Sequence, residues 1–558
     1  MMTLPFAAAA DLSNRLLTER VVQRIWDRDP SVWSASPDGA DARSIATRLG
    51  WLEAPAHMAG EIERVLQLAA DAVQERVEAV YLLGMGGSSL CAEVMRAVYG
   101  IAANHPELSV LDTTDERTIL AAASRMDPAR TWFLVSSKSG STVEVASLER
   151  FFWAQMVTAL GEGEAGRHFV AITDPGTVLE QLARTRRYRA AFLNPADIGG
   201  RFSAVSLFGL VPAALIGAPV RDLLSGAAAM AEGCRQHNHA NAGLELGAFI
   251  GAAAAAGHDK LTVILPPSLA SLGLWIEQLV AESTGKHGKG ALPVVDEPLA
   301  RADLYNADRA FVAISTDRDA PDGAMLHEIH EAGHPILRLR TRVDGLGAEF
   351  FRWEFGTAVA GAALGINPFD EPNVAEAKDR TKQLLASYGE RGNFPEAGPA
   401  AEERWWSVYS RAFSGASPAA VVRTAIDSVK PGDYVAFLSY LPADTGMQSA
   451  INNVRSAIRS RTRAATTYGI GPRYLHSTGQ YHKGGPNTAV AVLITADDDT
   501  QTTIPEAGYS FSLLKRAQAL GDIEALEAHE RRSIRIHIRG ELSQAPARVE
   551  QLFEEALK

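Results

Sequence analysis

Short apolar runs rich in β-branched residues alternate with longer helical patterns along most of this chain. In the first part they are AVYLLG at 79–84, LSVLDT at 108–113, TWFLVSS at 131–137 and HFVAITD at 168–174. After an alanine-rich helical stretch the rhythm resumes with LTVILPP at 261–267, AFVAIST at 310–316 and PILRLRT at 335–341. Continuous apolar strands separated by helices are typical of parallel sheets covered on both faces. We therefore predict an α/β fold with two doubly wound parallel sheets.

Glycine and proline in YGERGNFPEAGPAAEE, residues 388–403, indicate a domain boundary near residue 390. Beyond it, further strand and helix patterns predict a smaller C-terminal α/β unit of mixed topology. The first 50 residues have mostly helical patterns. The predicted organisation is an N-terminal helical segment at 1–50, two α/β domains at 51–230 and 231–390, and a C-terminal α/β extension at 391–558.

Composition narrows the range of partners and compartments. The 558 residues carry a net charge of −12, which disfavours binding to nucleic acid or to an anionic membrane surface. The two cysteines, Cys91 and Cys234, are too few for a disulfide framework and indicate a reducing, cytoplasmic location. The longest apolar stretch, at 204–220, contains two prolines and is shorter than a bilayer span of about 20 residues. We predict a buried helix there and no membrane association.

The first strand runs into a glycine-serine turn, YLLGMGGSSLCAEVM, in which Gly87 and Ser88 precede a helix. Backbone amides at a helix start suit an anion, and glycine lets the main chain approach it closely. A tight turn capped by serine explains the same residues equally well. The turn lacks the third glycine of a dinucleotide-binding fingerprint.

The third strand ends in VSSKSGSTVEV, at 135–145, where five hydroxyl side chains surround Gly140 before another helix. One serine or threonine would be enough to cap that helix. Several hydroxyl donors at a helix N-terminus suit the oxygens of a phosphate group. We therefore favour a phosphate-binding turn.

Glu282 lies in IEQLVAESTGKHGKG, at 276–290, where an apolar helix pattern changes into a cationic, glycine-rich loop. Gln278 and Glu282 are four residues apart and thus share one helix face. A carboxylate near a helix C-terminus interacts unfavourably with the negative end of the helix dipole, which weakens a purely structural explanation for Glu282. The structural alternative is an ion pair between Glu282 and Lys286.

These segments carry a resemblance to a known family. The glycine-serine turn and SSKSGST resemble the sugar isomerase domain, a doubly wound fold that binds phosphosugars. NPADIGGRFSAVSLFGL at 194–210, QLVAESTGKHGKG at 278–290 and INPFDEPNVAEAKDRTKQLL at 366–385 resemble, more narrowly, the glucose-6-phosphate isomerase family. The motifs occur in family order and cover about residues 75–390, so both α/β domains are expected to be sugar isomerase domains.

The resemblance implies a role for each matching residue. Phosphate binding falls to the two turns, namely Gly87, Ser88, Ser137, Lys138, Ser139 and Thr142. Arg201 would stand near the reacting oxygens, Gln278 and Glu282 would line the carbon that is deprotonated, and Lys378 would come from the helix after NPFDEPN. Moving a carbonyl between C1 and C2 requires one carbon-bound proton to be removed and returned through an enediolate. A single carboxylate can do both where water is excluded.

The implied activity is the interconversion of glucose 6-phosphate and fructose 6-phosphate, without cofactor or metal. Its implied partners are the phosphosugar substrate and a second copy of the chain, since the family is usually dimeric. The main alternative is a non-catalytic phosphosugar-binding regulator, which would have no use for Glu282, Gln278 and Arg201 together. A hexosamine synthase would need an N-terminal cysteine nucleophile, and both cysteines are internal.

Two features depart from the family. Glu371 stands where the family has glutamine, and its carboxylate would be repelled by a phosphosugar unless Lys378 or another cation offsets its charge. No family-like histidine segment occurs between 287 and 378. GIGPRYLHSTGQYHKGGPN, at 469–487, resembles the end of the isomerase half of fused transaldolase and glucose-6-phosphate isomerase proteins. Our hypothesis is that His476 or His482 in this segment assists ring opening, the alternative being a structural turn.

Overall fold

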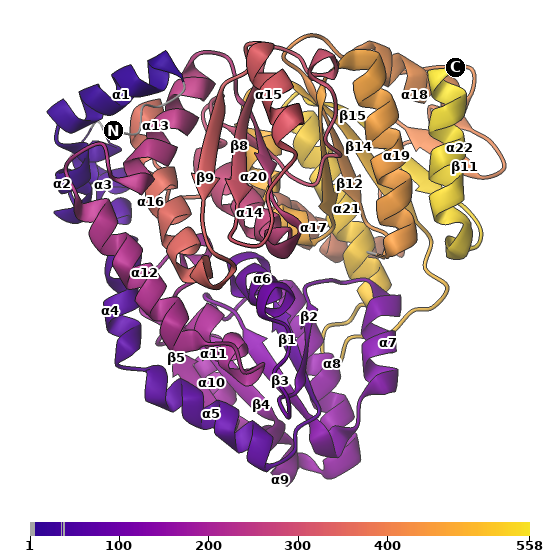
Figure 1. Cartoon of the computed structure of the whole chain (residues 1–558). Coiled ribbons are helices and arrows are strands. Elements are labelled where there is room, and N and C mark those ends of the chain that lie inside the picture. Colours follow the sequence, from indigo (N-terminus) through magenta and orange to yellow (C-terminus); the bar gives the residue numbers. More distant parts are fainter. Residues whose placement is uncertain (1–5, 35, 37–38, 443) are drawn as a thin grey trace.

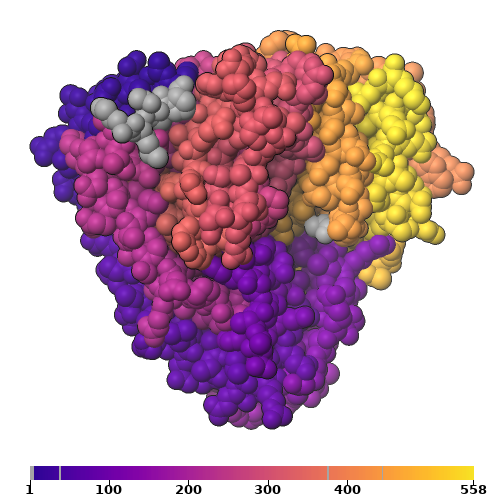
Figure 2. Space-filling view, in the orientation of Figure 1, coloured from indigo at the N-terminus to yellow at the C-terminus, as the bar shows by residue number. Residues whose placement is uncertain are grey.

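Three β-sheets form the framework of the chain in a computed structural model, which describes residues 6–34, 36, 39–442 and 444–558. In Figure 1 the first sheet lies below, and the second and third sheets lie above it. Figure 2 shows the purple first unit in contact with the red second unit and the orange and yellow third unit.

The first sheet has five parallel strands in the order β2-β1-β3-β4-β5. They are β1 (Ala79–Gly84), β2 (Glu107–Leu111), β3 (Thr131–Ser136), β4 (Phe169–Thr173) and β5 (Ala190–Leu193). Four of them match predicted strands to within two residues at either end. The short β5 was not predicted, because four residues give too little periodicity to recognise.

Alternate side chains of this sheet enter different cores. Val80 and Leu82 belong to one apolar cluster, whereas Tyr81 and Leu83 belong to another. The first face is covered by α5 (Ile62–Gln74), α6 (Leu90–Tyr99) and α11 (Leu207–Leu215), and the second by α7 (Glu116–Arg125), α8 (Val143–Leu160) and α10 (Val178–Thr185). All nine residues of α11 are buried, as predicted for this stretch.

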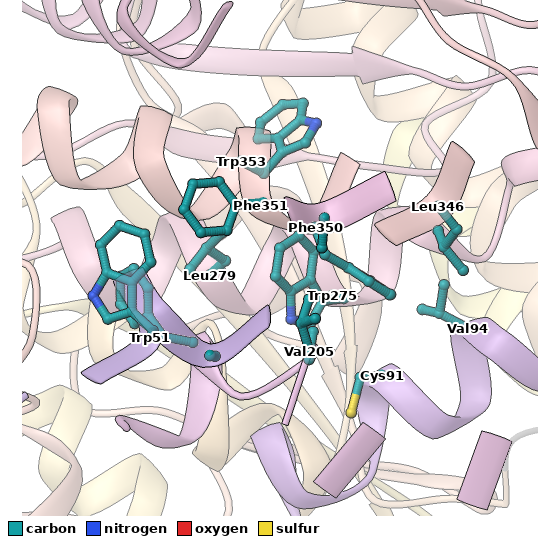
Figure 3. Packing of buried hydrophobic residues seen from close by; sticks show 14 of the residues in the cluster. Trp51, Cys91, Val94, Val205, Trp275, Leu279, Leu346, Phe350, Phe351 and Trp353 are labelled. Atoms are coloured by element: carbon teal, nitrogen blue, oxygen red, sulfur yellow. The ribbon is translucent and has the colours of Figure 1, made fainter. Parts of the chain in front are cut away.

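The second sheet has four parallel strands in the order β7-β6-β8-β9. They are β6 (Lys260–Ile264), β7 (Leu292–Val294), β8 (Arg309–Ser315) and β9 (Ile336–Arg340). Beside it, α16 (Leu346–Leu364) packs on α12 (Val220–Arg235), α13 (Ala242–Ala255) and α14 (Leu272–Thr284). Figure 3 shows this core, in which Trp275 of α14 meets Phe350 of α16 at 4.8 Å between ring centroids. The core fixes α14, the helix that carries Glu282.

The third sheet is mixed and has the order β10-β11-β15-β14-β12-β13. Its parallel part comprises β12 (Tyr434–Ser439), β13 (Ala465–Ile470), β14 (Ala489–Ala496) and β15 (Arg532–Ile538), and β10 (Ala401–Glu402) and β11 (Trp406–Tyr409) add antiparallel pairs. One face is covered by α18 (Pro418–Asp427), α19 (Thr445–Thr462) and α22 (Ala545–Leu557). The other face packs on α20 (Gly479–Gly484), α21 (Phe511–Ala528) and residues of α14 and β7.

The predicted fold class, two doubly wound parallel units plus a mixed C-terminal α/β unit, is confirmed by this arrangement. The domain boundaries stay a prediction. The long helix α17 (Val374–Arg391) spans the predicted boundary near 390 and packs on α21 of the third unit. None of the described helices combines the length and the apolar character that a membrane crossing requires.

Glu354 of α16 gives a test of this packing. It is 1% exposed, and among the described residues it has no ion-pair partner, so burial raises its pKa well above the ordinary value of 4.5. The folded state therefore keeps a proton that the unfolded state loses as the pH rises. Relative to Glu354→Gln, the free energy of unfolding of the wild type should fall by about 1.4 kcal/mol per pH unit above pH 5, until the buried carboxyl ionises.

Chemical denaturation between pH 5 and pH 8 measures this difference. The matched control is Glu63→Gln, whose side chain is 77% exposed and which should follow the wild type at every pH. A constant difference between the wild type and Glu354→Gln would mean that Glu354 is ionised in the folded protein.

Candidate active site

The two turns singled out in the sequence meet at the carboxyl edge of the first sheet. Gly84 of β1 pairs with Ser136 of β3, and the Ser136 hydroxyl donates to the Ser88 carbonyl at 2.8 Å. A Cβ on Gly87 would lie 2.0 Å from the Gly200 carbonyl oxygen, so only glycine allows this approach. The segment that carries Arg201 is thereby held against the first turn.

The second turn presents its hydroxyls at the start of α8. Ser137 Oγ and Thr142 Oγ1 are 3.0 Å apart, and the Ser141 hydroxyl lies 3.2 Å from that of Ser139. Thr142 is the N-cap residue of α8, yet within the described chain its side chain caps no helix amide. The amides at this positive helix end are thus available to an anion.

A cavity of about 330 Å³ opens in front of this turn. Ser139 and Thr142 line one side of it, and Lys378 and Lys382 of α17 line another. A helix N-terminus, hydroxyl donors and two ammonium groups around one cavity favour a doubly charged anion such as a phosphate monoester.

The Lys138 side chain points away from the cavity that the neighbouring residues of the turn line. Its ammonium contacts the Asp174 carboxylate after β4 and donates to the Ala196 carbonyl at 2.9 Å. Among the described residues that line the cavity, Lys138 does not occur. Its phosphate contact stays a prediction.

His476 reaches the same cavity from the third unit. Its Nε2 lies 3.0 Å from Oε1 of Glu144, a buried residue in the first turn of α8, and the Gln518 amide donates to the same oxygen at 2.7 Å. Burial alone would raise the pKa of Glu144, but the charge and hydrogen bond of His476 hold it below its ordinary value. An ionised Glu144 therefore orients the imidazole.

The sequence did not single out Glu144 or Gln518. An acidic residue directly after a hydroxyl-rich helix start was an available signal for Glu144, although helix dipoles favour acids there in any case. Gln518 had no local signal, because it lies 374 residues from Glu144 in the sequence.

Gln278 and Glu282 lie together on the buried face of α14. The Gln278 amide donates to Glu282 Oε2 at 3.2 Å and to the His476 carbonyl at 2.8 Å. Both side chains are almost fully buried. Gln278 therefore joins the Glu282 carboxylate to the segment that carries His476.

Arg201 is held by main-chain and side-chain acceptors on two sides. Its Nη2 donates to the carbonyls of Pro368 and Asp370 at 2.8 Å each, and its Nε donates to Ser283 Oγ at 2.8 Å. The side chain is 4% exposed. These bonds fix the direction of the remaining nitrogen, Nη1.

Nη1 of Arg201 lies between two carboxylates. It is 3.4 Å from Glu282 Oε1 and 3.0 Å from Glu371 Oε2. Burial raises the pKa of Glu282; the Arg201 charge opposes that rise, and the Glu371 charge adds to it. Burial acts in the same direction on Glu371, but Arg201 and Arg48 hold its pKa below the ordinary value. Glu371 thus takes the larger share of the guanidinium charge, and Glu282 is left as the stronger base.

The cations that offset the charge of Glu371 are Arg201, at 3.0 Å, and Arg48, at 3.9 Å, rather than Lys378. Lys286 does not pair with Glu282. Its ammonium binds the Asn367 carbonyl and both the carbonyl and the carboxylate of Asp370, each at 2.5 Å, and burial lowers its pKa to about 8. The structural alternative for Glu282, an ion pair with Lys286, is wrong.

His482 lies away from these groups. Its Nδ1 is 2.8 Å from the Tyr434 hydroxyl, its ring stacks on that tyrosine, and it is 2% exposed. Burial lowers its pKa to about 3, which keeps the ring neutral at physiological pH. Of the two histidines singled out in the sequence, the cavity wall formed by the described residues includes His476 alone.

Comparison with known proteins adds independent information. A family model described as phosphoglucose isomerase matches residues 18–297, half of the chain. Among relatives, a glucose-6-phosphate isomerase of Rubrobacter xylanophilus is 28% identical over 388 residues, covering 60% of this chain and 88% of its own length. One from Mycoplasmopsis pulmonis is 28% identical over 392 residues, covering 60% of this chain and 90% of its own.

Two solved structures share the fold. A hypothetical protein of Thermus thermophilus gives a TM-score of 0.59 at 24% identity, covering 68% of this chain and 98% of that one. A glucose-6-phosphate isomerase of Chlamydia trachomatis gives 0.54 at 19% identity, covering 70% and 87%. The family model includes both turns, Arg201 and Glu282, and ends before Lys378 and His476.

The shared guanidinium predicts an effect of Glu371 on Glu282. In Glu371→Gln the pKa of Glu282 should fall. The substitution removes the negative charge beside Glu282, and the Arg201 guanidinium then pairs with Glu282 alone. Carbon-13 NMR titration of the glutamate side chains measures this directly. Glu376→Gln is the matched control, since Glu376 binds Arg380 and His529 instead. An unchanged pKa for Glu282 in Glu371→Gln would contradict the coupling.

Proposed function

Because the chain belongs to the phosphoglucose isomerase family, we propose that it interconverts glucose 6-phosphate and fructose 6-phosphate. The observation that carries the proposal is the position of a desolvated carboxylate, Glu282, which lies 3.4 Å from the Arg201 guanidinium and is joined through Gln278 to His476 in the wall of the cavity in front of α8. The names of the matched relatives support the same reaction.

The phosphate of the sugar would occupy the cavity at the start of α8. The groups that we expect to hold it come from the two turns and from α17: Gly87, Ser88, Ser137, Lys138, Ser139, Thr142 and Lys378. The doubly charged phosphate then meets the positive end of a helix, several hydroxyl donors and the Lys378 ammonium, while the sugar chain extends toward α14.

Glu282 would act as the general base. In the direction from aldose to ketose its carboxylate takes the proton from C2, and the electron pair passes to the C1 oxygen, which gives an enediolate. A proton moves from O2 to O1, and Glu282 returns its proton to C1, so the carbonyl now stands at C2. A raised pKa makes Glu282 a stronger base than an exposed glutamate, and burial keeps water from competing for the proton.

Arg201 would stabilise the oxygen that becomes negative in the enediolate. Its guanidinium is already fixed by carbonyls and Ser283, so little reorganisation accompanies the charge as it develops. Such a preoriented positive group is worth about 3 kcal/mol in comparable sites. Glu371 balances Arg201 in the resting site, which prevents the guanidinium from neutralising the base beside it.

His476 would open the sugar ring by giving a proton to the ring oxygen as the hydroxyl at C1 loses its own. Glu144 holds the imidazole at the cavity, so the third unit would supply the residue for ring opening. We assign this role to His476, since His482 is enclosed against Tyr434.

Isotope transfer tests the general base. Fructose 6-phosphate incubated with the enzyme in deuterated water should give glucose 6-phosphate with deuterium at C2, and Glu282→Gln should lower kcat by about 1000-fold because an amide cannot take the proton from carbon. Mass spectrometry of the product measures both. The matched control is Glu277→Gln on the same helix: burial raises the pKa of Glu277 to about 8, so glutamine mimics its neutral state.

A phosphosugar-binding regulator would behave differently. It would bind fructose 6-phosphate without turnover, and Glu282→Gln would change nothing. Turnover without any solvent deuterium in the product would contradict the proposed exchange of the proton on Glu282.

Ring opening has its own test. His476→Ala should lower kcat/KM for glucose 6-phosphate by about 100-fold, because protonation of the ring oxygen is lost. A 4,5-dideoxy analogue, which cannot close a furanose or a pyranose ring, should be turned over by the variant at nearly the wild-type rate. The comparison variant is His482→Ala, which should reduce the free energy of unfolding without this substrate selectivity. Equal losses on both substrates in His476→Ala would contradict the assignment.

A further inference from the structure

The third unit has a cavity of its own at the carboxyl edge of its sheet. A space of about 260 Å³ is lined by Tyr440 after β12, by Thr495 and Ala496 at the end of β14, and by Arg535 of β15. The chain passes from β12 to β13 on one side and then to β14 on the other. In open α/β sheets, the carboxyl ends at such a reversal are where small molecules commonly bind. The site proposed above lies elsewhere, in front of α8.

Two arginines in this cavity share a single carboxylate. Oε1 of Glu396 accepts from Arg516 at 2.6 and 3.1 Å, and Oε2 accepts from Arg535 at 2.7 Å. Two guanidinium groups on one carboxylate reproduce the way in which arginines hold a bound carboxylate or phosphate. The third cation, Lys515, is already paired with Asp115 at 2.9 Å and Asp498 at 2.5 Å. Glu396 neutralises one of the two guanidinium charges, and the carboxylates of Asp497 and Asp498 also line the cavity.

Glu396 belongs to the connection between α17 and β10, at 392–400, which has no regular structure. Phe394 anchors this connection, with its ring 4.8 Å from that of Tyr388. A smaller cavity of about 80 Å³ is also lined by Glu396, on the side of Arg411 and Glu527. The carboxylate therefore has space into which it can withdraw without disturbing the Phe394 anchor.

We propose that Arg516 and Arg535 form a second binding site for a small phosphate monoester, and that Glu396 occupies this site when no ligand is bound. A doubly charged phosphate would neutralise both guanidinium groups, whereas Glu396 neutralises only one. The cavity beside the pair has room for the remainder of a small phosphorylated molecule, and Tyr388 and Tyr440 offer apolar faces to it.

Two connections join this site to the cavity in front of α8. The first connection is helix α21: its Arg516 lines the cavity of the third unit, and its Gln518 lines the cavity in front of α8. The Tyr440 hydroxyl lies 3.3 Å from that of Tyr474, which precedes His476 by two residues. A ligand at the arginine pair should therefore alter kcat through the His476 segment. This consequence rests on the proposed isomerase activity, whereas the binding site itself does not.

Phosphate binding to the full chain tests the site. Calorimetric titration of the wild type with inorganic phosphate should show two sites per chain, one in front of α8 and one at the arginine pair. Arg516→Gln should retain one, and its side chain is 57% exposed, so folding should not suffer. Arg411→Gln, whose guanidinium lies 3.0 Å from Glu527, is the matched control and should retain both. Glu396→Gln should tighten the second site about tenfold, because a charged competitor is removed.

Hydrogen exchange identifies which site is filled. Phosphate should speed exchange of the amides at 393–400 in the wild type, since Glu396 leaves the arginines, and should have no such effect in Arg516→Gln. One phosphate per chain in both the wild type and Glu396→Gln, with unchanged exchange at 393–400, would overturn the proposal. Absence of isomerase turnover would leave these binding results as they stand, so the two proposals fail separately.

Discussion

The buried guanidinium of Arg201 is the interaction on which the site depends. Burying an arginine is costly unless its donors are paired, and here they bind Ser283, two carbonyls and the carboxylates of Glu282 and Glu371. These partners come from α14, between β6 and β7, and from the segment just before α17. Removing the guanidinium would leave two carboxylates close together in a low-dielectric interior, and both would resist ionisation.

Much of the fold could be predicted because its signals are local. Strands buried on both faces are recognised as continuous apolar runs in the sequence. The turns at 84–89 and 136–142 are recognised by their glycine and hydroxyl residues. The four-residue spacing of Gln278 and Glu282 likewise predicts their common face, and the structure brings the two side chains together. The short strands β5 and β7 escaped prediction because three or four residues show no period.

The remaining features of the site depend on contacts between distant segments. Nothing near Arg48 indicates that it supports Glu371, and nothing near Glu144 indicates that it holds His476. The sequence could not decide whether His476 or His482 faces the cavity, because both lie in one glycine-rich segment and differ only in the direction of their side chains. One faces the cavity, whereas the other lies against Tyr434. Such directions are set by tertiary packing, in this case by the contact of α20 with α14 and by the hydrogen bond from Gln278 of α14 to the His476 carbonyl.

The position of Glu371 resolves an apparent conflict of charges. A carboxylate beside a phosphosugar site would repel the ligand. Glu371, however, lies at Arg201 and Arg48, while the cavity in front of α8 has cations of its own on α17. The two groups of charges are therefore separate: in the proposed function, hydroxyls and lysines set the affinity for the anion, and the shared guanidinium sets the basicity of Glu282. With glutamine at 371, Arg201 would pair with Glu282 alone, which would lower the pKa of Glu282 and make it a weaker base. Glutamate at 371 thus shifts part of the arginine charge away from Glu282, the residue that we propose accepts a proton from carbon.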